Sequence, residues 1–113
     1  MLEINNEKVN ILDNLNELSE VLEHIYYYFD KLSQSIDLPL VLETKKNSVT
    51  LKNGEKYLQA RWGGIDSITF RSHEKLYGSI IWSRKWYVDS LLGGKTGNFT
   101  NRVLDRIFED FIN

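Results

Sequence analysis

Cysteine is absent from this 113-residue chain, and proline occurs once. Without cysteine no disulfide forms, no thiol nucleophile is present, and the sequence does not indicate a redox compartment. The N-terminus lacks a basic region followed by an apolar run, and no window approaches the ~20 apolar residues that span a membrane. We therefore expect a soluble, cytoplasmic protein.

Phosphate-binding motifs are also lacking, although one stretch near the C-terminus resembles them. LLGGKTGNFTNRVLDRIF places a Gly-Lys-Thr turn before a helix. A phosphate-binding loop needs another glycine five residues before Gly94. That position holds Asp89, a carboxylate where the anion would have to bind. We interpret the stretch as a flexible connector in which Thr96, Asn98 or Thr100 caps the last helix.

Side chains for catalysis or metal binding are few. The two histidines are far apart, and we expect His24 at the boundary of a helix and His73 in a solvated turn. Neither has carboxylates nearby at the spacing of a metal site, and no sharp-turn motif surrounds a serine. Glu17, Glu20 and Glu23 are typical of the solvated face of a helix. The sequence therefore predicts no enzyme, no metal site and no cofactor.

The clearest pattern that is present is an apolar stripe near the N-terminus. Its spacings alternate between four and three residues, which predicts a long helix, and Pro39 ends it. A helix over residues 7–36 would be ~45 Å long, whereas a compact domain of this length is roughly 35 Å across. The stripe either packs in the core of its own domain or forms part of a homodimer. Its residues are Ile11, Leu15, Leu18, Leu22, Ile25, Phe29, Leu32 and Ile36.

After Pro39 the apolar period changes from 3.5 to two, which indicates strands. Asn53-Gly54 is expected to form a two-residue hairpin turn between arms at 49–52 and 55–62. Residues 84–92 are ambiguous between a strand and a helical turn, and an amphipathic helix follows the glycine-rich loop. We predict one α+β domain over residues 1–113, with a four- to five-stranded antiparallel sheet and both helices mainly on one face. The other strands are expected at 38–44, 65–72 and 77–83.

The net charge of −2 hides a strong segregation of charge along the chain. Residues 1–43 carry a net charge of −7, and residues 44–102 carry a net charge of +7. An acidic helix that attracts a basic sheet within one fold would explain this. So would a basic surface that faces an anionic partner.

The basic middle of the chain also contains aromatic residues, and we expect it to supply the partner-binding surface. A sheet covered by helices on one side leaves its other face free. Mixed aromatic and positive side chains are typical of platforms for single-stranded nucleic acid, although no RNA-binding signature is present. The candidate residues are Tyr57, Gln59, Arg61, Thr69, Arg71, Lys75, Arg84, Lys85 and Trp86.

By elimination, the sequence favours a non-enzymatic protein-binding factor. Inhibitor, immunity protein, anti-defence protein and chaperone-like adaptor all fit a small domain without catalytic residues. The abundance of Asn, Ile, Lys and Tyr hints at AT-rich coding DNA, and therefore at a bacterium, a phage or a mobile element. The expected partner is a protein, with a homodimer as a further expectation. The alternative is a single-stranded nucleic-acid-binding protein.

Overall fold

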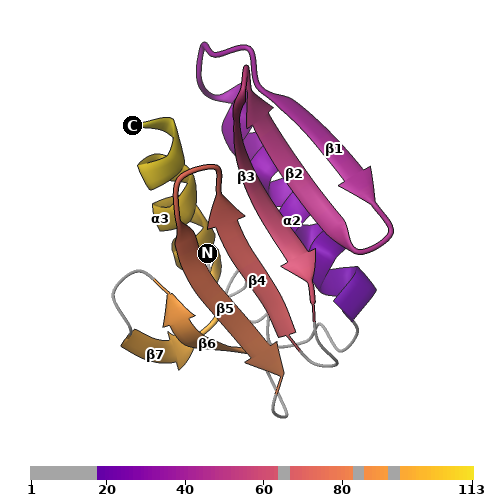
Figure 1. The fold of residues 1–113 in the computed structure, drawn as a ribbon, viewed down its shortest axis with the longest axis vertical. Helices are drawn as coiled ribbons and strands as arrows, with labels where there is room; N and C mark the ends of the chain where they lie inside the picture. Colours follow the sequence, from indigo (N-terminus) through magenta and orange to yellow (C-terminus); the bar gives the residue numbers. More distant parts are fainter. Residues whose placement is uncertain (1–17, 64–66, 83–85, 92–94) are drawn as a thin grey trace, which may run out of the picture.

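The computed structural model describes residues 18–63, 67–82, 86–91 and 95–113 (Figure 1). Within these ranges helix α2 comes first, a sheet of seven strands follows, and helix α3 comes last. The strands lie in sequence order, and each pairs antiparallel with the next. The predicted α+β class with an antiparallel sheet is confirmed. The bounds are α2 (Leu18–Gln34), β1 (Val41–Lys45), β2 (Ser48–Asn53), β3 (Lys56–Trp62), β4 (Ser67–Ser72), β5 (Leu76–Trp82), β6 (Trp86–Leu91), β7 (Lys95–Asn98) and α3 (Asn101–Ile112).

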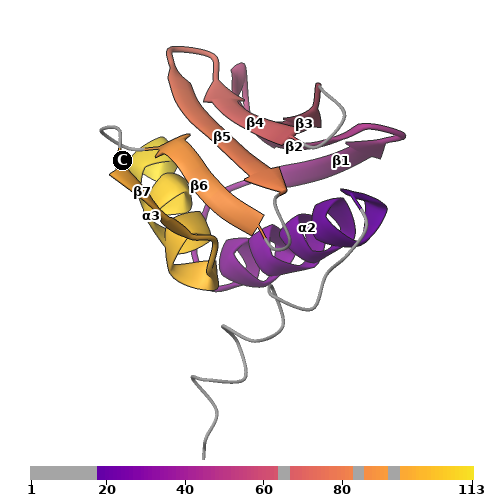
Figure 2. The ribbon, with the colours of Figure 1, turned by 90° about the horizontal axis from the view of Figure 1, so that it is seen from below.

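Both helices lie on the same side of the curved sheet (Figure 2). One continuous core lies between the two helices and the sheet. It buries Ile25 and Phe29 from α2 together with Leu104 from α3. Leu58 and Phe70 reach this core from the sheet, because alternate residues of a strand point to the same face. The apolar stripe on α2 is therefore core, as one of the two sequence interpretations expected.

Helix α2 ends at Gln34, a little before the predicted end at Ile36. The backbone N–H of Ser35 and its hydroxyl both donate to the carbonyl of Leu32, at 3.1 and 2.7 Å. These bonds reach back three residues and tighten the last turn, so the helix stops before Pro39 requires it. The part of the predicted helix before Leu18 lies outside the described residues, so its expected excess length stays a prediction.

The β2–β3 hairpin turns one residue later than predicted. Asn53 pairs with Lys56, which leaves Gly54 and Glu55 as the loop. Gly54 has a φ of 65°, a value that glycine adopts at less cost than asparagine, so Asn53 stays in the strand. Moving the turn by one residue shifts the register between β2 and β3 by two residues. Because side chains alternate between faces with a period of two, each side chain stays on its predicted face of the sheet.

The described sheet has seven strands, two more than the upper number predicted. Residues 86–91 form β6, which settles the ambiguity there, and Lys95–Asn98 form β7 where a flexible connector was expected. The prediction was wrong because β7 has no apolar alternation; it is a strand because it pairs with β6. Thr100 occupies the N-cap position of α3, but its side chain makes no capping hydrogen bond there.

Candidate partner-binding surfaces

The face of the sheet opposite the helices is open over its central strands (Figures 1 and 2). Alternation along β3 and β4 places Tyr57, Gln59, Arg61, Thr69 and Arg71 on this open face, as the sequence predicted. Each of these side chains is exposed or half-buried. The inward neighbours Leu58, Ala60, Ile68 and Phe70 are fully buried.

Arg61 and Arg71 occupy diagonal positions at the centre of this face. Arg61 pairs with Thr69, and Arg71 pairs with Gln59. In this diagonal arrangement the Cα atoms of two residues on neighbouring strands lie roughly 7–8 Å apart. Both side chains are exposed. Neither makes an ion pair with any residue that the structure describes. Two like charges thus stand side by side without a counter-ion from the described chain.

The polar side chains around the two arginines form hydrogen bonds and an ion pair with one another. Gln59 Nε2 donates to Thr50 Oγ1 at 3.2 Å, and the hydroxyls of Thr69 and Ser79 lie 3.1 Å apart. Nearer the edge, Lys52 Nζ lies 3.0 Å from Glu43 Oε2. These cross-strand contacts fix a polar platform from which the arginines project.

The other predicted partner-binding residues do not join this group. Lys75 lies in the β4–β5 turn and faces the helix side, where its Nζ is 2.7 Å from Asp110 Oδ2 and 5.1 Å from the ring centroid of Tyr77. Arg84 and Lys85 lie outside the described residues. The backbone of Trp86 begins β6, but its side chain is outside the described part of the chain.

Lys75 instead belongs to a contact between the β4–β5 turn and α3. The Tyr77 hydroxyl donates to Asp110 Oδ2 at 2.6 Å. The hydrogen bond from Lys75, and to a smaller extent the one from Tyr77, holds the pKa of Asp110 below its usual range. Burial, followed by the hydrogen bond to Asp110, raises the pKa of Tyr77. This cluster anchors the helix and presents no free charge to a partner.

The histidines have structural surroundings. His24 is half-buried between the helices, and burial lowers its pKa below the ordinary 6.5, although a hydrogen bond to Asn101 opposes the shift. His73 is exposed in its turn, with Nε2 3.2 Å from Glu74 Oε1. Within the described ranges, no three His, Asp or Glu side chains cluster closely enough to hold a metal ion.

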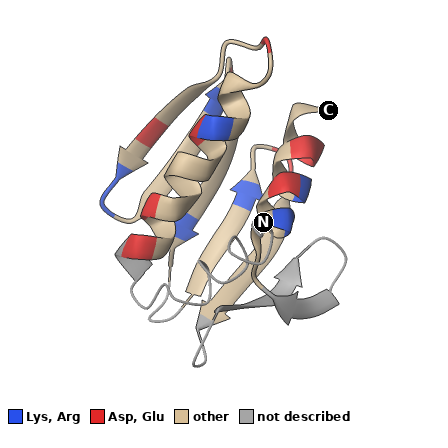
Figure 3. Cartoon of the chain, turned by 180° about the vertical axis from the view of Figure 1, so that it is seen from behind, with Lys and Arg blue, Asp and Glu red and all other residues tan. Residues whose placement is uncertain are grey.

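Many of the described acidic residues belong to helices α2 and α3 (Figure 3). Glu20 and Glu23 on α2 are exposed there, whereas Arg61 and Arg71 project from the opposite face of the sheet. The sheet therefore separates these two arginines from the acidic helix. At these two positions, the segregation of charge along the chain is therefore not explained by attraction between the acidic helix and the sheet.

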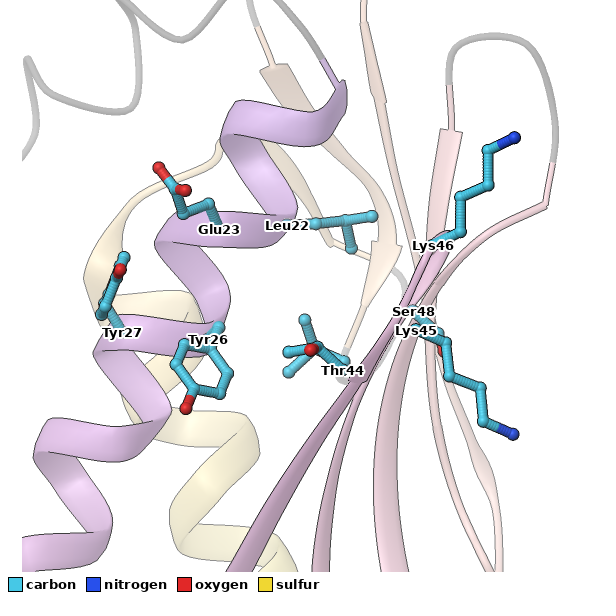
Figure 4. Close-up of a pocket in the computed structure, with 9 residues that line it drawn as sticks. Leu22, Glu23, Tyr26, Tyr27, Thr44, Lys45, Lys46 and Ser48 are labelled. Atoms are coloured by element: carbon cyan, nitrogen blue, oxygen red, sulfur yellow. The ribbon is translucent and has the colours of Figure 1, made fainter.

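A second surface feature was missed by sequence reasoning. A groove of about 400 Å³ lies between α2 and the β1–β2 hairpin. Leu22 and Thr44 extend into the gap between helix and strands, and Tyr26 also lines the groove. Glu23 and Tyr27 point away from the sheet (Figure 4). No sequence pattern marks the groove, because it depends on how far the helix stands from the edge of the sheet.

The chain matches no family model, no curated protein and no solved structure. Its function is therefore argued from its own residues. Among the described helices, none is both long and apolar enough to cross a membrane.

Proposed function

We propose that this protein is a non-enzymatic binding factor whose open sheet face contacts an acidic surface of a partner protein in the cytoplasm. The observation that carries the proposal is the exposed pair Arg61 and Arg71, diagonal on neighbouring strands and without an ionic partner in the described chain. Repulsion between the two guanidinium groups is relieved when a carboxylate binds beside them.

The surroundings of the pair support this role. The hydrogen bonds of Thr50 with Gln59 and of Thr69 with Ser79 hold the platform in place before a partner arrives. A preorganised surface loses less conformational entropy on binding. Arginine is also enriched in protein interfaces, and its planar group binds carboxylates through two parallel hydrogen bonds.

The biological role that fits best is that of an inhibitor, an immunity or anti-defence protein, or a chaperone-like adaptor of a bacterium, phage or mobile element. Small size, the scarcity of catalytic motifs and the composition of the chain support this part of the proposal. A homodimer is compatible with it, because the open face and the helices are separate surfaces.

Single-stranded nucleic acid is the second candidate partner, and one observation favours it. Tyr57 shares the open face with Arg61 and Arg71, at one end of β3. A tyrosine ring stacks on bases while arginines contact phosphates. The ring of Tyr57 lies 6.1 Å from that of His73 at an angle of 59° and is half-buried, so only part of it is open for stacking.

A pull-down from a lysate of the encoding organism, with and without nuclease, tests the proposal. The wild-type chain should retain the same protein under both conditions. Arg61→Glu with Arg71→Glu should lose it, because the charge of the patch is reversed. The matched control is Arg102→Glu with Arg106→Glu, two exposed arginines of α3. It changes the net charge equally and should retain the partner. A partner that disappears with nuclease would support the nucleic-acid alternative.

A further inference from the structure

Strand β1 forms an edge of the described sheet, and its free side has backbone groups available for pairing. The turn at Lys46 and Asn47 closes on the pair Lys45 and Ser48. Antiparallel strands alternate between residues that bond inward and residues that bond outward. The N–H of Trp62 donates to the carbonyl of Asn47 at 2.8 Å. This bond shows which residues of β2 form backbone hydrogen bonds toward β3 and which form them toward β1.

The same alternation decides which residues of β1 direct their backbone N–H and C=O groups toward the free edge. Asn47 bonds toward β3, so Ser48 bonds toward β1 and engages Lys45. The N–H and C=O groups of Leu42 and Thr44 therefore point away from β2. Neither residue takes part in a backbone hydrogen bond to a described segment beyond β1, and Thr44 is exposed.

The groove lies directly beside this edge. The side chains of Leu42 and Thr44 point to the helix face of the sheet, as do those of Leu51 and Val49, with which they pair. Tyr26 from α2 borders the groove on its other side (Figure 4). A strand added beside β1 would place every second side chain over this groove.

Positive charge is concentrated at one end of the same edge. Lys45 and Lys46 are exposed and extend away from α2 (Figure 4). Neither forms an ion pair with a residue that the structure describes. Glu43, on the same face as Lys45, is already neutralised by Lys52 at 3.0 Å.

We propose that the edge of β1 accepts an extended segment of another protein as an additional antiparallel or parallel strand. The segment carries an apolar side chain that enters the groove beside Tyr26. Its neighbouring residue is acidic and lies next to Lys45 on the opposite face. Backbone hydrogen bonds to Leu42 and Thr44 supply affinity, and the groove and the lysine supply specificity. This interface lies at the edge of the sheet and does not include Arg61 or Arg71, so it does not depend on the function proposed above.

A phage-displayed library of random nine-residue peptides tests the proposal. Selection on the wild-type chain should enrich peptides with an apolar residue next to an acidic one. Their affinity, measured by fluorescence anisotropy, should fall at least about tenfold for Thr44→Pro, because proline removes the outward N–H and leaves the bonds to β2 intact. Thr44→Val keeps the N–H and is the matched control. Equal binding to Thr44→Pro, or no enrichment, overturns the proposal.

Two further measurements keep the result interpretable. If Thr44→Pro does not fold, as judged by circular dichroism, Tyr26→Ala and Lys45→Glu replace it. A peptide with lysine in place of its acidic residue should then recover affinity for Lys45→Glu. Sedimentation velocity identifies the competing occupant. A wild-type dimer that Thr44→Pro converts to monomers would assign the edge to a second copy of the chain and overturn the proposal.

Discussion

The Nε2 atom of His24 lies 2.7 Å from Oδ1 of Asn101, although 77 positions separate the two residues in the chain. One helical turn further, the hydroxyl of Tyr28 donates to Asp105 Oδ1 at 2.7 Å. The His24 and Tyr28 rings also stack, with centroids 5.9 Å apart. These contacts form a polar seam that sets how α2 and α3 lie beneath the sheet.

We predict that the seam makes stability depend on pH. Burial lowers the pKa of His24 below 6.5 in the folded chain, so the unfolded chain takes up the proton first as the pH falls. The free energy of unfolding should therefore decrease from pH 7.5 through the region below 6.5 until the folded pKa is passed. Urea unfolding at several pH values measures this. His24→Gln should reduce the decrease. An unchanged decrease in His24→Gln would assign the effect to other groups.

Ile25 is fully buried in the core, so Ile25→Ala should lower the free energy of unfolding by ~2–5 kcal/mol through lost burial and a residual cavity. The neighbouring Tyr27 is 61% exposed, and Tyr27→Ala should cost no more than about 0.5 kcal/mol. Denaturant unfolding of both variants measures the difference. A negligible effect of Ile25→Ala would mean that the stripe on α2 is not core in solution.

Gly54 has space for a Cβ but a φ of +65°. Gly54→Ala should therefore cost ~1–2 kcal/mol from backbone strain alone. Gly54→Asn should cost less, because asparagine tolerates this conformation better than alanine. Gly63 also has open space around it and lacks a positive φ, so Gly63→Ala is the control and should be nearly neutral. Equal losses at both glycines would contradict the turn geometry. Thermal unfolding resolves these differences.

The sequence predicted those parts of the fold that depend on local pattern. The spacing of Leu22, Ile25 and Phe29 identified a buried helix face, and the alternation of Ile68, Thr69 and Phe70 identified the faces of β4. Five residues of the open face followed from the same alternation.

Features that depend on distant contacts were not predictable in this way. Lys75 was assigned to the binding surface because it is basic, but its direction is decided by Asp110 on α3. Strand β7 exists through its pairing with β6, and the groove depends on the packing of α2 against β1. None of these contacts leaves a periodic signal in the chain.

The nucleic-acid alternative makes a separate prediction for an unstructured single-stranded oligonucleotide. We expect weaker than micromolar binding at physiological salt. If the open face did bind the strand, log affinity would fall linearly with log salt, by a slope of about −0.7 per phosphate neutralised. Tyr57→Ala would then cost ~1–3 kcal/mol from lost stacking. Fluorescence anisotropy at several salt concentrations distinguishes these results, and micromolar or tighter binding with a steep slope would favour the alternative.

The most direct test of the open-face proposal is the binding kinetics of the purified protein partner, measured by surface plasmon resonance. Arg61→Glu with Arg71→Glu should weaken binding by about an order of magnitude or more, largely through slower association if the arginines lie at the rim of the interface. The fold should remain intact, because exposed charges contribute little to stability. Arg102→Glu with Arg106→Glu should bind like the wild type. Unchanged kinetics for the Arg61 and Arg71 reversal would contradict the proposal that the open face contacts the partner.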